Sequence, residues 1–331
     1  MRAKLMLLVI GFQLLVLGYM AGEREWVLRR GEIIYLRTAP MDPVDPFRGN
    51  YVRLDYDISR VPTNQLRGGL TELTPGKARQ GSLVYAALLP TEGGVARLDY
   101  LSDVKPTGGL FLRGRLDRYW QGAIVPVRYG LEAFFAQPDK AKQMEDLRRR
   151  GEVQVPLEME VAVSGKGLSV MKGYRWCRLG IGTKLEMVST TNRAIRAVTI
   201  TLMNVSTNTL AVVDQKDGLS LTLESDTVRS WGNHHWQWVG LGRSLPAVTD
   251  ADVVVLKPGE SHLIRVDLTQ SEWFVTADKV VKSLPELQDA GAMFRLIYHS
   301  PTLEQCRSLK NASLIWHGEL PSRAFGGGRV D

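Results

Sequence analysis

Residues 51–58, YVRLDYDI, set the expectation for the fold of the first half of this chain. Their apolar members, Val52, Leu54, Tyr56 and Ile58, occupy every second position. Successive side chains of a strand point to opposite faces, so this alternation predicts a β-strand with one face in a core and the other in water. The residues expected on the wet face are Tyr51, Arg53, Asp55 and Asp57.

Similar strand signals surround this segment. Short runs rich in β-branched and aromatic residues, bounded by Gly and Pro, occur at 31–38, 82–89 and 95–101. A hairpin is expected across residues 153–174, with its turn at Gly165-Lys166-Gly167. One helix is predicted over 138–150, where Pro precedes an acidic start and a basic end. We therefore expect a first domain, residues 23–175, that is mainly β with one helix.

The second half of the chain has a different spacing of strand signals. Eight short candidate strands, at 196–206, 209–214, 219–225, 236–241, 252–257, 262–268, 293–300 and 313–320, are separated by turn residues. This spacing is typical of an antiparallel β-sandwich. We expect an immunoglobulin-like (Ig-like) sandwich over 179–322, followed by a mobile tail at 323–331.

The N-terminus predicts a membrane segment. Residues 5–22, LMLLVIGFQLLVLGYMAG, span about 27 Å as a helix, enough for a thin hydrocarbon core. We expect residues 1–22 to form an uncleaved signal-anchor. A cleaved signal peptide is the alternative, although the apolar run is long for one and Tyr19-Met20-Ala21 does not fit a cleavage site.

Composition narrows the class of protein. The chain has 331 residues, of which 44% are hydrophobic and 23% charged, so it is an ordinary globular sequence and not a disordered one. Its net charge is +7, and the excess lies beside the N-terminal segment. This location favours weak, salt-sensitive attraction to anionic lipid head groups. Because no polybasic run is present, we do not expect a nucleic-acid partner.

One stretch resembles a known family. Residues 38–59, TAPMDPVDPFRGNYVRLDYDIS, are similar to the motif of the membrane-anchored GDYXXLXY family, although Asn50 stands where the motif has Asp. The resemblance extends over about 5–175 and includes Leu-Arg-Gly-Arg at 112–115. It implies a bacterial, membrane-anchored protein and no defined reaction. The positions that carry the motif are Gly49, Asn50, Tyr51, Leu54 and Tyr56.

The motif has a structural and a functional interpretation. As a scaffold, Gly49-Asn50 permits the turn that enters the strand, and the Asp-Pro pairs keep the approach extended. As a functional surface, the wet face forms an acidic and aromatic patch that binds a partner. The candidate interaction face comprises Asp42, Asp45, Arg48, Tyr51, Arg53, Asp55 and Asp57.

No catalytic or cofactor motif stands out. The segment after the anchor lacks the serine that a signal peptidase needs. The adjacent His234 and His235 would diverge in a strand and so do not indicate a zinc site. We therefore predict no catalytic residues, no cofactor, no metal and no enzymatic activity.

Two features leave alternatives open. Trp231, Trp236 and Trp238 would form a platform for cell-wall glycans if exposed, whereas a Trp pair on one strand face is more often core. Cys177 and Cys306 would form a disulfide in an oxidising compartment, or remain two buried thiols.

Together these observations predict a single-pass protein of the bacterial inner membrane with its bulk in the periplasm. We expect a non-enzymatic scaffold whose partners are membrane lipid, through the N-terminal helix, and a membrane or envelope protein. The alternative is a glycan-binding protein that uses the tryptophan platform.

Overall fold

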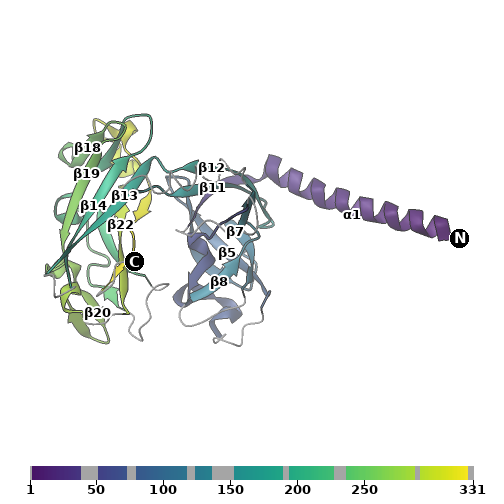
Figure 1. Cartoon of the computed structure of the whole chain (residues 1–331), viewed down its shortest axis with the longest axis horizontal. Helices are drawn as coiled ribbons and strands as arrows, with labels where there is room; N and C mark the ends of the chain where they lie inside the picture. Colours follow the sequence, from purple (N-terminus) through teal and green to yellow (C-terminus); the bar gives the residue numbers. More distant parts are fainter. Residues whose placement is uncertain are drawn as a thin grey trace. The chain divides into compact units, whose positions relative to one another are not determined.

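The structure is a computed structural model that describes residues 2–38, 51–72, 80–117, 124–135, 153–188, 194–226, 236–287 and 291–326. The described part is mainly β, as the sequence predicts, with one long apolar helix at the N-terminus (Figure 1). The predicted helix at 138–150 lies outside the described residues.

The chain divides into two units. Unit 1 comprises Met1–Pro90, Val95–Phe135 and Glu158–Arg175, and unit 2 comprises Thr91–Gly94, Ala136–Leu157 and Trp176–Asp331. Unit 1 thus ends at Arg175, where we expect the first domain to end, but two segments inside 23–175 group with unit 2.

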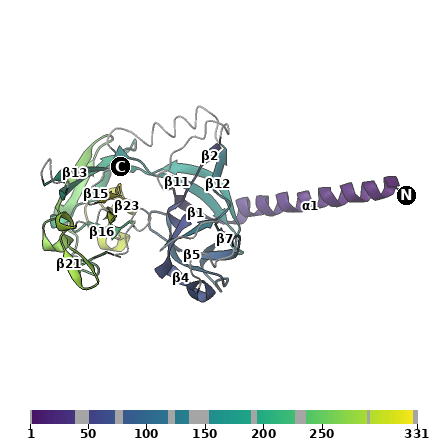
Figure 2. The ribbon, with the colours of Figure 1, turned by 60° about the horizontal axis from the view of Figure 1, so that its bottom comes forward.

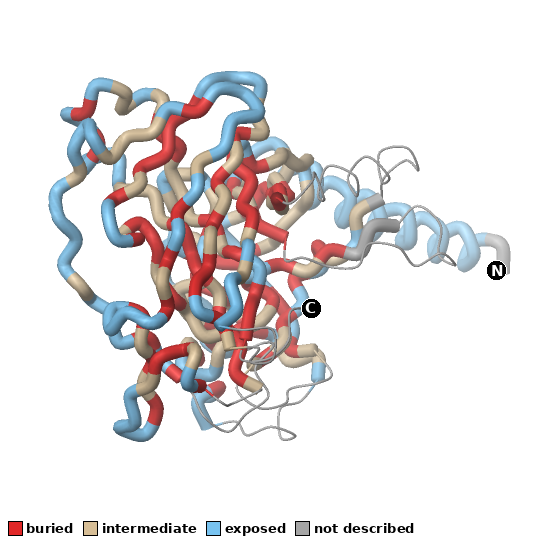
Figure 3. The backbone as a smooth tube through the Cα atoms, turned by 60° about the vertical axis from the view of Figure 1, so that its left-hand side comes forward, coloured by how far each residue is buried: buried red, intermediate tan, exposed pale blue. Residues whose placement is uncertain are grey.

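Helix α1 (Arg2–Arg30) is long and apolar enough to span a membrane (Figure 1). Its side chains are exposed along most of its length, coloured pale blue in Figure 3, until Val27, which is only 2% exposed. Gly31 donates its N–H to the Val27 carbonyl at 2.8 Å, and strand β1 begins one residue later. The helix therefore ends in direct contact with unit 1, without an intervening linker.

The described residues of unit 1 form three sheets (Figure 2). The six-stranded sheet is antiparallel except for the parallel β4–β6 pair. Alternation along its strands buries Leu101 and Leu112 completely, as the period of two requires. The sheets are β1 (Glu32–Arg37), β11 (Leu157–Val163), β12 (Ser169–Trp176); β2 (Tyr51–Arg53), β9 (Ala133–Phe135); and β3 (Arg60–Pro62), β8 (Ile124–Arg128), β7 (Leu110–Leu116), β5 (Leu83–Pro90), β6 (Ala96–Ser102), β4 (Leu66–Arg67).

The strand predicted over 51–58 is shorter in the structure. β2 ends at Arg53, and a 3-10 turn follows at Asp57–Ser59. The predicted core face is nevertheless correct where side chains are described, since Leu54, Tyr56 and Ile58 are all buried. The alternation therefore reports burial, while the turn interrupts the ladder.

Unit 2 contains four sheets. The two larger ones contribute to a single hydrophobic cluster that includes Ile200 and Leu202 of β14 and Leu221 and Leu296 of β16 and β22. The sheets are β10 (Val153–Gln154), β13 (Leu179–Met187), β14 (Ile195–Asn204), β19 (Ser261–Asp267); β15 (Leu210–Val213), β18 (Val253–Leu256); β16 (Leu221–Ser225), β22 (Met293–His299), β23 (Glu319–Pro321), with β24 (Phe325–Gly326) also on β22; and β17 (Gln237–Trp238), β20 (Val275–Ala277), β21 (Val280–Lys282).

Two predictions for unit 2 need correction. Residues 313–320 are mostly not a strand, because a 3-10 turn occupies Ala312–Leu314 and β23 begins only at Glu319. The tail is not mobile throughout, since Phe325 of β24 pairs with Phe294 and is buried. The Ig-like assignment stays a prediction.

Candidate functional site

The family-like motif is fastened to a loop of unit 1. The hydroxyl of Tyr56, which is completely buried, donates a hydrogen bond to the Leu131 carbonyl at 2.7 Å. The Leu54 amide donates to the Glu132 carbonyl at 2.8 Å. β2 extends this contact by pairing with β9, which follows the loop. The motif thus attaches the segment 129–132 to the core.

The loop is braced from its own side as well. The Tyr129 hydroxyl donates to the Ile58 carbonyl at 2.9 Å. The Glu132 carboxylate accepts the N–H groups of Tyr129 at 2.5 Å and Gly130 at 3.0 Å, which closes a tight turn in which Gly130 has φ of 78°. Burial, and secondarily the charge of Glu132, raises the pKa of Tyr56 and of Tyr129. Both hydroxyls therefore act as neutral structural donors.

The predicted interaction face is only partly visible. Asp55 is held by Arg60 at 2.7 Å, so one of its acidic members is paired locally, whereas Asp57 is exposed. Asp42, Asp45, Arg48, Gly49 and Asn50 lie outside the described residues, and Tyr51 and Arg53 are described by their backbone only.

The braced loop forms one wall of an open pocket of about 620 Å³ in unit 1. The other walls come from the end of α1, from β7, from the β8 terminus and from the β11–β12 hairpin. Gly167, with φ of 75°, provides the turn of that hairpin as predicted. The charged residues that line the pocket are Arg24, Arg113, Arg115, Asp117, Arg128 and Glu132. Its apolar lining includes Leu116, Leu168, Val170 and Met171.

Basic side chains outnumber acidic ones in this pocket. Asp117 is paired with Arg128 at 3.1 Å, and the Glu132 carboxylate is occupied by backbone amides. Arg115 donates to the Gly81 carbonyl at 2.7 Å, which fixes its direction. Arg24 and Arg113 have no ion-pair partner among the residues that the structure describes. The pocket, which we name the arginine pocket, therefore carries an excess of positive charge.

Sequence reasoning missed the arginine pocket because its walls come from five separate segments. One signal was available, since in Leu112-Arg113-Gly114-Arg115 the two arginines alternate and must share a strand face. Gly114 between them has no room for a side chain, because a Cβ there would lie 2.7 Å from Val127.

Of the two alternatives for the tryptophans, the structure shows the core for Trp236 and Trp238 and contradicts an exposed platform built on them. Trp236 and Trp238 are only 7% and 5% exposed and belong to the unit 2 core, while Trp231 lies outside the described residues. Trp238 stacks on Trp273 with ring centroids 5.5 Å apart and donates its indole N–H to the Glu272 carbonyl. Both rings are buried among apolar side chains, so neither presents a face on which a sugar could stack.

The disulfide between Cys177 and Cys306 is absent. Neither thiol is in a disulfide, both are buried, and each belongs to a different hydrophobic cluster of unit 2. The start and the end of this unit meet instead in the larger cluster, which contains both Leu179 and Phe325.

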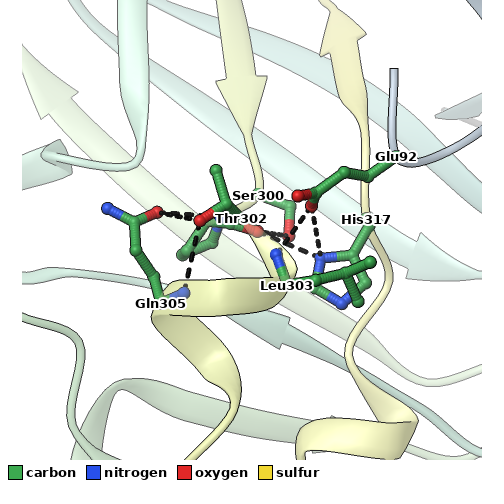
Figure 4. A network of polar contacts seen from close by, with 7 residues as sticks. Glu92, Ser300, Thr302, Leu303, Gln305 and His317 are labelled. Carbon is green, nitrogen blue, oxygen red and sulfur yellow. Dashed lines mark hydrogen bonds and ion pairs between the residues drawn. The ribbon is translucent and has the colours of Figure 1, made fainter. Parts of the chain in front are cut away.

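The three histidines of unit 2 that the structure describes each face a carboxylate. His262 lies 2.7 Å from Asp214, and His317 lies 3.7 Å from Glu92 within the network of Figure 4. In that network Glu92 accepts the Leu303 amide at 2.7 Å, at the start of the one-turn helix α3 (Leu303–Cys306). These contacts secure a loop. No cluster of three metal-ligating side chains occurs among the described residues, and His234 and His235 lie outside them.

Thr222, His299 and Glu319 form a chain of hydroxyl, imidazole and carboxylate. The Thr222 hydroxyl lies 2.7 Å from His299 Nε2, and His299 Nδ1 lies 3.2 Å from Glu319. The three residues come from adjacent strands of one sheet, in which His299 and Glu319 are direct partners. Cross-strand pairing accounts for the arrangement without a reaction.

Comparison with known proteins places the N-terminal part of the chain. A family model described as GDYXXLXY protein matches residues 13–173. No curated protein and no solved structure matches the chain. The match covers α1 from Gln13 onward, the motif and the residues of the arginine pocket. Together with a helix able to span a membrane, it fits a membrane-anchored protein. Residues 13–173, just under half of the chain, therefore match the GDYXXLXY protein family.

Proposed function

We propose that this protein is a non-enzymatic scaffold, anchored in the bacterial inner membrane with both β-units in the periplasm, and that it binds a membrane or envelope protein. The observation that carries the proposal is the join between α1 and unit 1. Val27 is buried and β1 starts directly after Gly31, so unit 1 is held at the membrane surface. A binding surface held there meets partners that are themselves confined to the membrane.

The orientation is tested by reporter fusions to the C-terminus of the full chain. We expect alkaline phosphatase, which is active only outside the cytoplasm, to be active, and green fluorescent protein to stay dark. The reverse pattern would place both units in the cytoplasm and overturn the periplasmic part of the proposal.

The partner is tested by placing a photoreactive amino acid at Asp57, an exposed member of the predicted interaction face. Irradiation of native membranes is expected to give a discrete crosslinked product that contains a membrane or envelope protein. The same photoreactive amino acid, placed at the exposed Lys216 of unit 2, is the control for random collision. A product pattern identical at both sites would contradict the interaction face.

The absence of enzymatic activity is part of the proposal, and the Thr222–His299–Glu319 chain is its sharpest test. We expect a fluorophosphonate probe to label the folded protein no more than its Thr222→Val variant. Labelling that the variant abolishes would identify an activated hydroxyl and would overturn the non-enzymatic assignment.

A further inference from the structure

We propose that the arginine pocket binds the phosphate-bearing head group of an anionic membrane lipid. The proposal rests on the membrane anchoring of α1 but not on the identity of any protein partner. Four arginines line the pocket, and its two carboxylates are already engaged by Arg128 and by backbone amides. Guanidinium groups hold phosphate through paired, charge-assisted hydrogen bonds.

The arrangement of the arginines favours one bound anion. Arg113 and Arg115 stand on the same face of β7, and both are exposed at their side chains. The Arg115 guanidinium is fixed by the Gly81 carbonyl, which uses one of its five N–H donors and leaves the others available. Arg24 and Arg113 have no described ion-pair partner, so a phosphate would not have to displace a carboxylate from either.

The height of the pocket matches the head-group layer. Arg24 lies two residues after Gly22, the last residue of the apolar run, and a helix rises about 1.5 Å per residue. Arg24 is therefore about 3 Å beyond the apolar segment, at the level of the lipid phosphates. Because Val27 fixes the helix end to unit 1, the remaining walls of the pocket are held near this level.

The lining also distinguishes a lipid from a soluble phosphate. Leu168, Val170 and Met171 of the β11–β12 hairpin line the same pocket and are only half-buried. A free phosphate would leave these side chains in water. The glycerol and first methylenes of a lipid would cover them, so phosphate and apolar contacts are satisfied by one molecule.

The motif supports this site from behind. Tyr56 and Leu54 attach the loop 129–132, which is a wall of the pocket, to the core of unit 1. The GDYXXLXY motif would then act as a positioning element for the arginine pocket, since its described side chains, Leu54 and Tyr56, do not themselves line the pocket.

The test uses the full chain in neutral detergent with four probes: dioctanoyl phosphatidylglycerol, dioctanoyl phosphatidylcholine, glycerol 1-phosphate and inorganic phosphate. Calorimetric titration is expected to show saturable binding of the phosphatidylglycerol, weakened by salt, and weaker binding of the other three. Equal binding of glycerol 1-phosphate would identify a soluble anion as the ligand and overturn the lipid assignment.

Substitutions test the location. The double variant Arg113→Gln, Arg115→Gln is expected to weaken phosphatidylglycerol binding about tenfold or more. The control double variant Arg67→Gln, Lys105→Gln removes the same charge from unit 1 outside the pocket. It is expected to change phosphatidylglycerol binding little. An equal loss in both double variants would mean non-specific attraction and would overturn the site. Arg24→Gln, outside the β-fold, repeats the test where the double variant fails to fold; unchanged binding in Arg24→Gln would also overturn it.

Discussion

At the scale of single residues, buried tyrosine hydroxyls stabilise each unit from within. Tyr56 and Tyr129 donate across to each other's segments in unit 1. In unit 2 the Tyr298 hydroxyl accepts the Val213 amide at 2.9 Å and donates to the Val213 carbonyl at 3.1 Å. Each hydroxyl forms a hydrogen bond with a main-chain group that is shielded from water. Removing the hydroxyl destabilises the fold by more than the net contribution of the bond, because the buried main-chain group is left without a partner.

Tyr56→Phe is expected to lower the free energy of unfolding by about 1–3 kcal/mol, because the Leu131 carbonyl loses its buried donor. Urea denaturation of the full chain in detergent measures the change. Tyr85→Phe removes the same atom from a ring that packs edge-on against Phe111 and is expected to be nearly neutral. Equal effects of the two substitutions would contradict the role of the hydrogen bond.

Stability is also expected to fall in alkali. Burial raises the pKa of Tyr56, Tyr129 and Tyr298 above the ordinary value of 10.0, so the folded state keeps protons that the unfolded state releases. The contribution is fully present below pH 10 and declines above it, by about 1.4 kcal/mol per pH unit for each tyrosine. Urea titrations from pH 9 to 11 measure the slope, which Tyr56→Phe should reduce by one tyrosine's share.

At the scale of elements, alternation predicted the positions of most strands but not their ends. β1, β5, β6, β14 and β19 occupy the expected segments. The predicted strand at 51–58 is too long. The turn at Asp57–Ser59 keeps the Ile58 side chain buried, but it does not continue the backbone pairing of the strand. The predicted strand at 313–320 differs for a similar reason, since the buried Ile315 and Trp316 follow the Ala312–Leu314 turn and form an isolated bridge with Ala211 in place of a ladder. Apolar periodicity reports which side chains reach the core and does not report which backbone groups are paired.

The arginine pocket was beyond sequence reasoning because it depends on tertiary contacts among α1, β7, the β8 terminus and the β11–β12 hairpin. The motif residues Leu54 and Tyr56 were identified, but their partners in the loop 129–132 lie more than 70 residues away. Tryptophan burial likewise depends on Trp273, which stacks on Trp238 from another part of the chain.

The junction between helix and sheet gives an element-scale prediction. A Cβ on Gly31 would lie 2.5 Å from the Val27 carbonyl and 3.0 Å from the backbone of Val163, so Gly31→Ala forces main-chain movement. We expect a loss of about 1–3 kcal/mol, measured by thermal unfolding of the full chain. Gly22→Ala, which meets nothing within 4 Å, is the matched control and should leave the transition unchanged.

At the scale of the whole molecule, each β-unit has its own strands and core, and no disulfide links cysteines among the described residues. Cys177 belongs to the large cluster of unit 2 and Cys306 to the smaller one. Desolvation by burial raises the pKa of the Cys306 thiol, which disfavours the reactive thiolate. We therefore expect the fold to be independent of the redox state of its surroundings.

We expect neither thiol of the native full chain to react with an aromatic disulfide reagent, and both to react after denaturation. Mobility on denaturing gels should be the same with and without reductant. A mobility shift on reduction, together with no reactive thiols after denaturation, would indicate a Cys177–Cys306 bond and contradict the packing of the two clusters.

The single glycine between α1 and β1 has a mechanical consequence. With Val27 seated in unit 1 and Gly31 pressed against β11, the junction has no slack for swivelling. We therefore expect a roll or tilt of the helix in the bilayer to turn the sheets of unit 1 with it. The orientation of unit 1 toward its neighbours in the membrane then follows the tilt of the helix. A change in bilayer thickness, which changes that tilt, changes the orientation of unit 1.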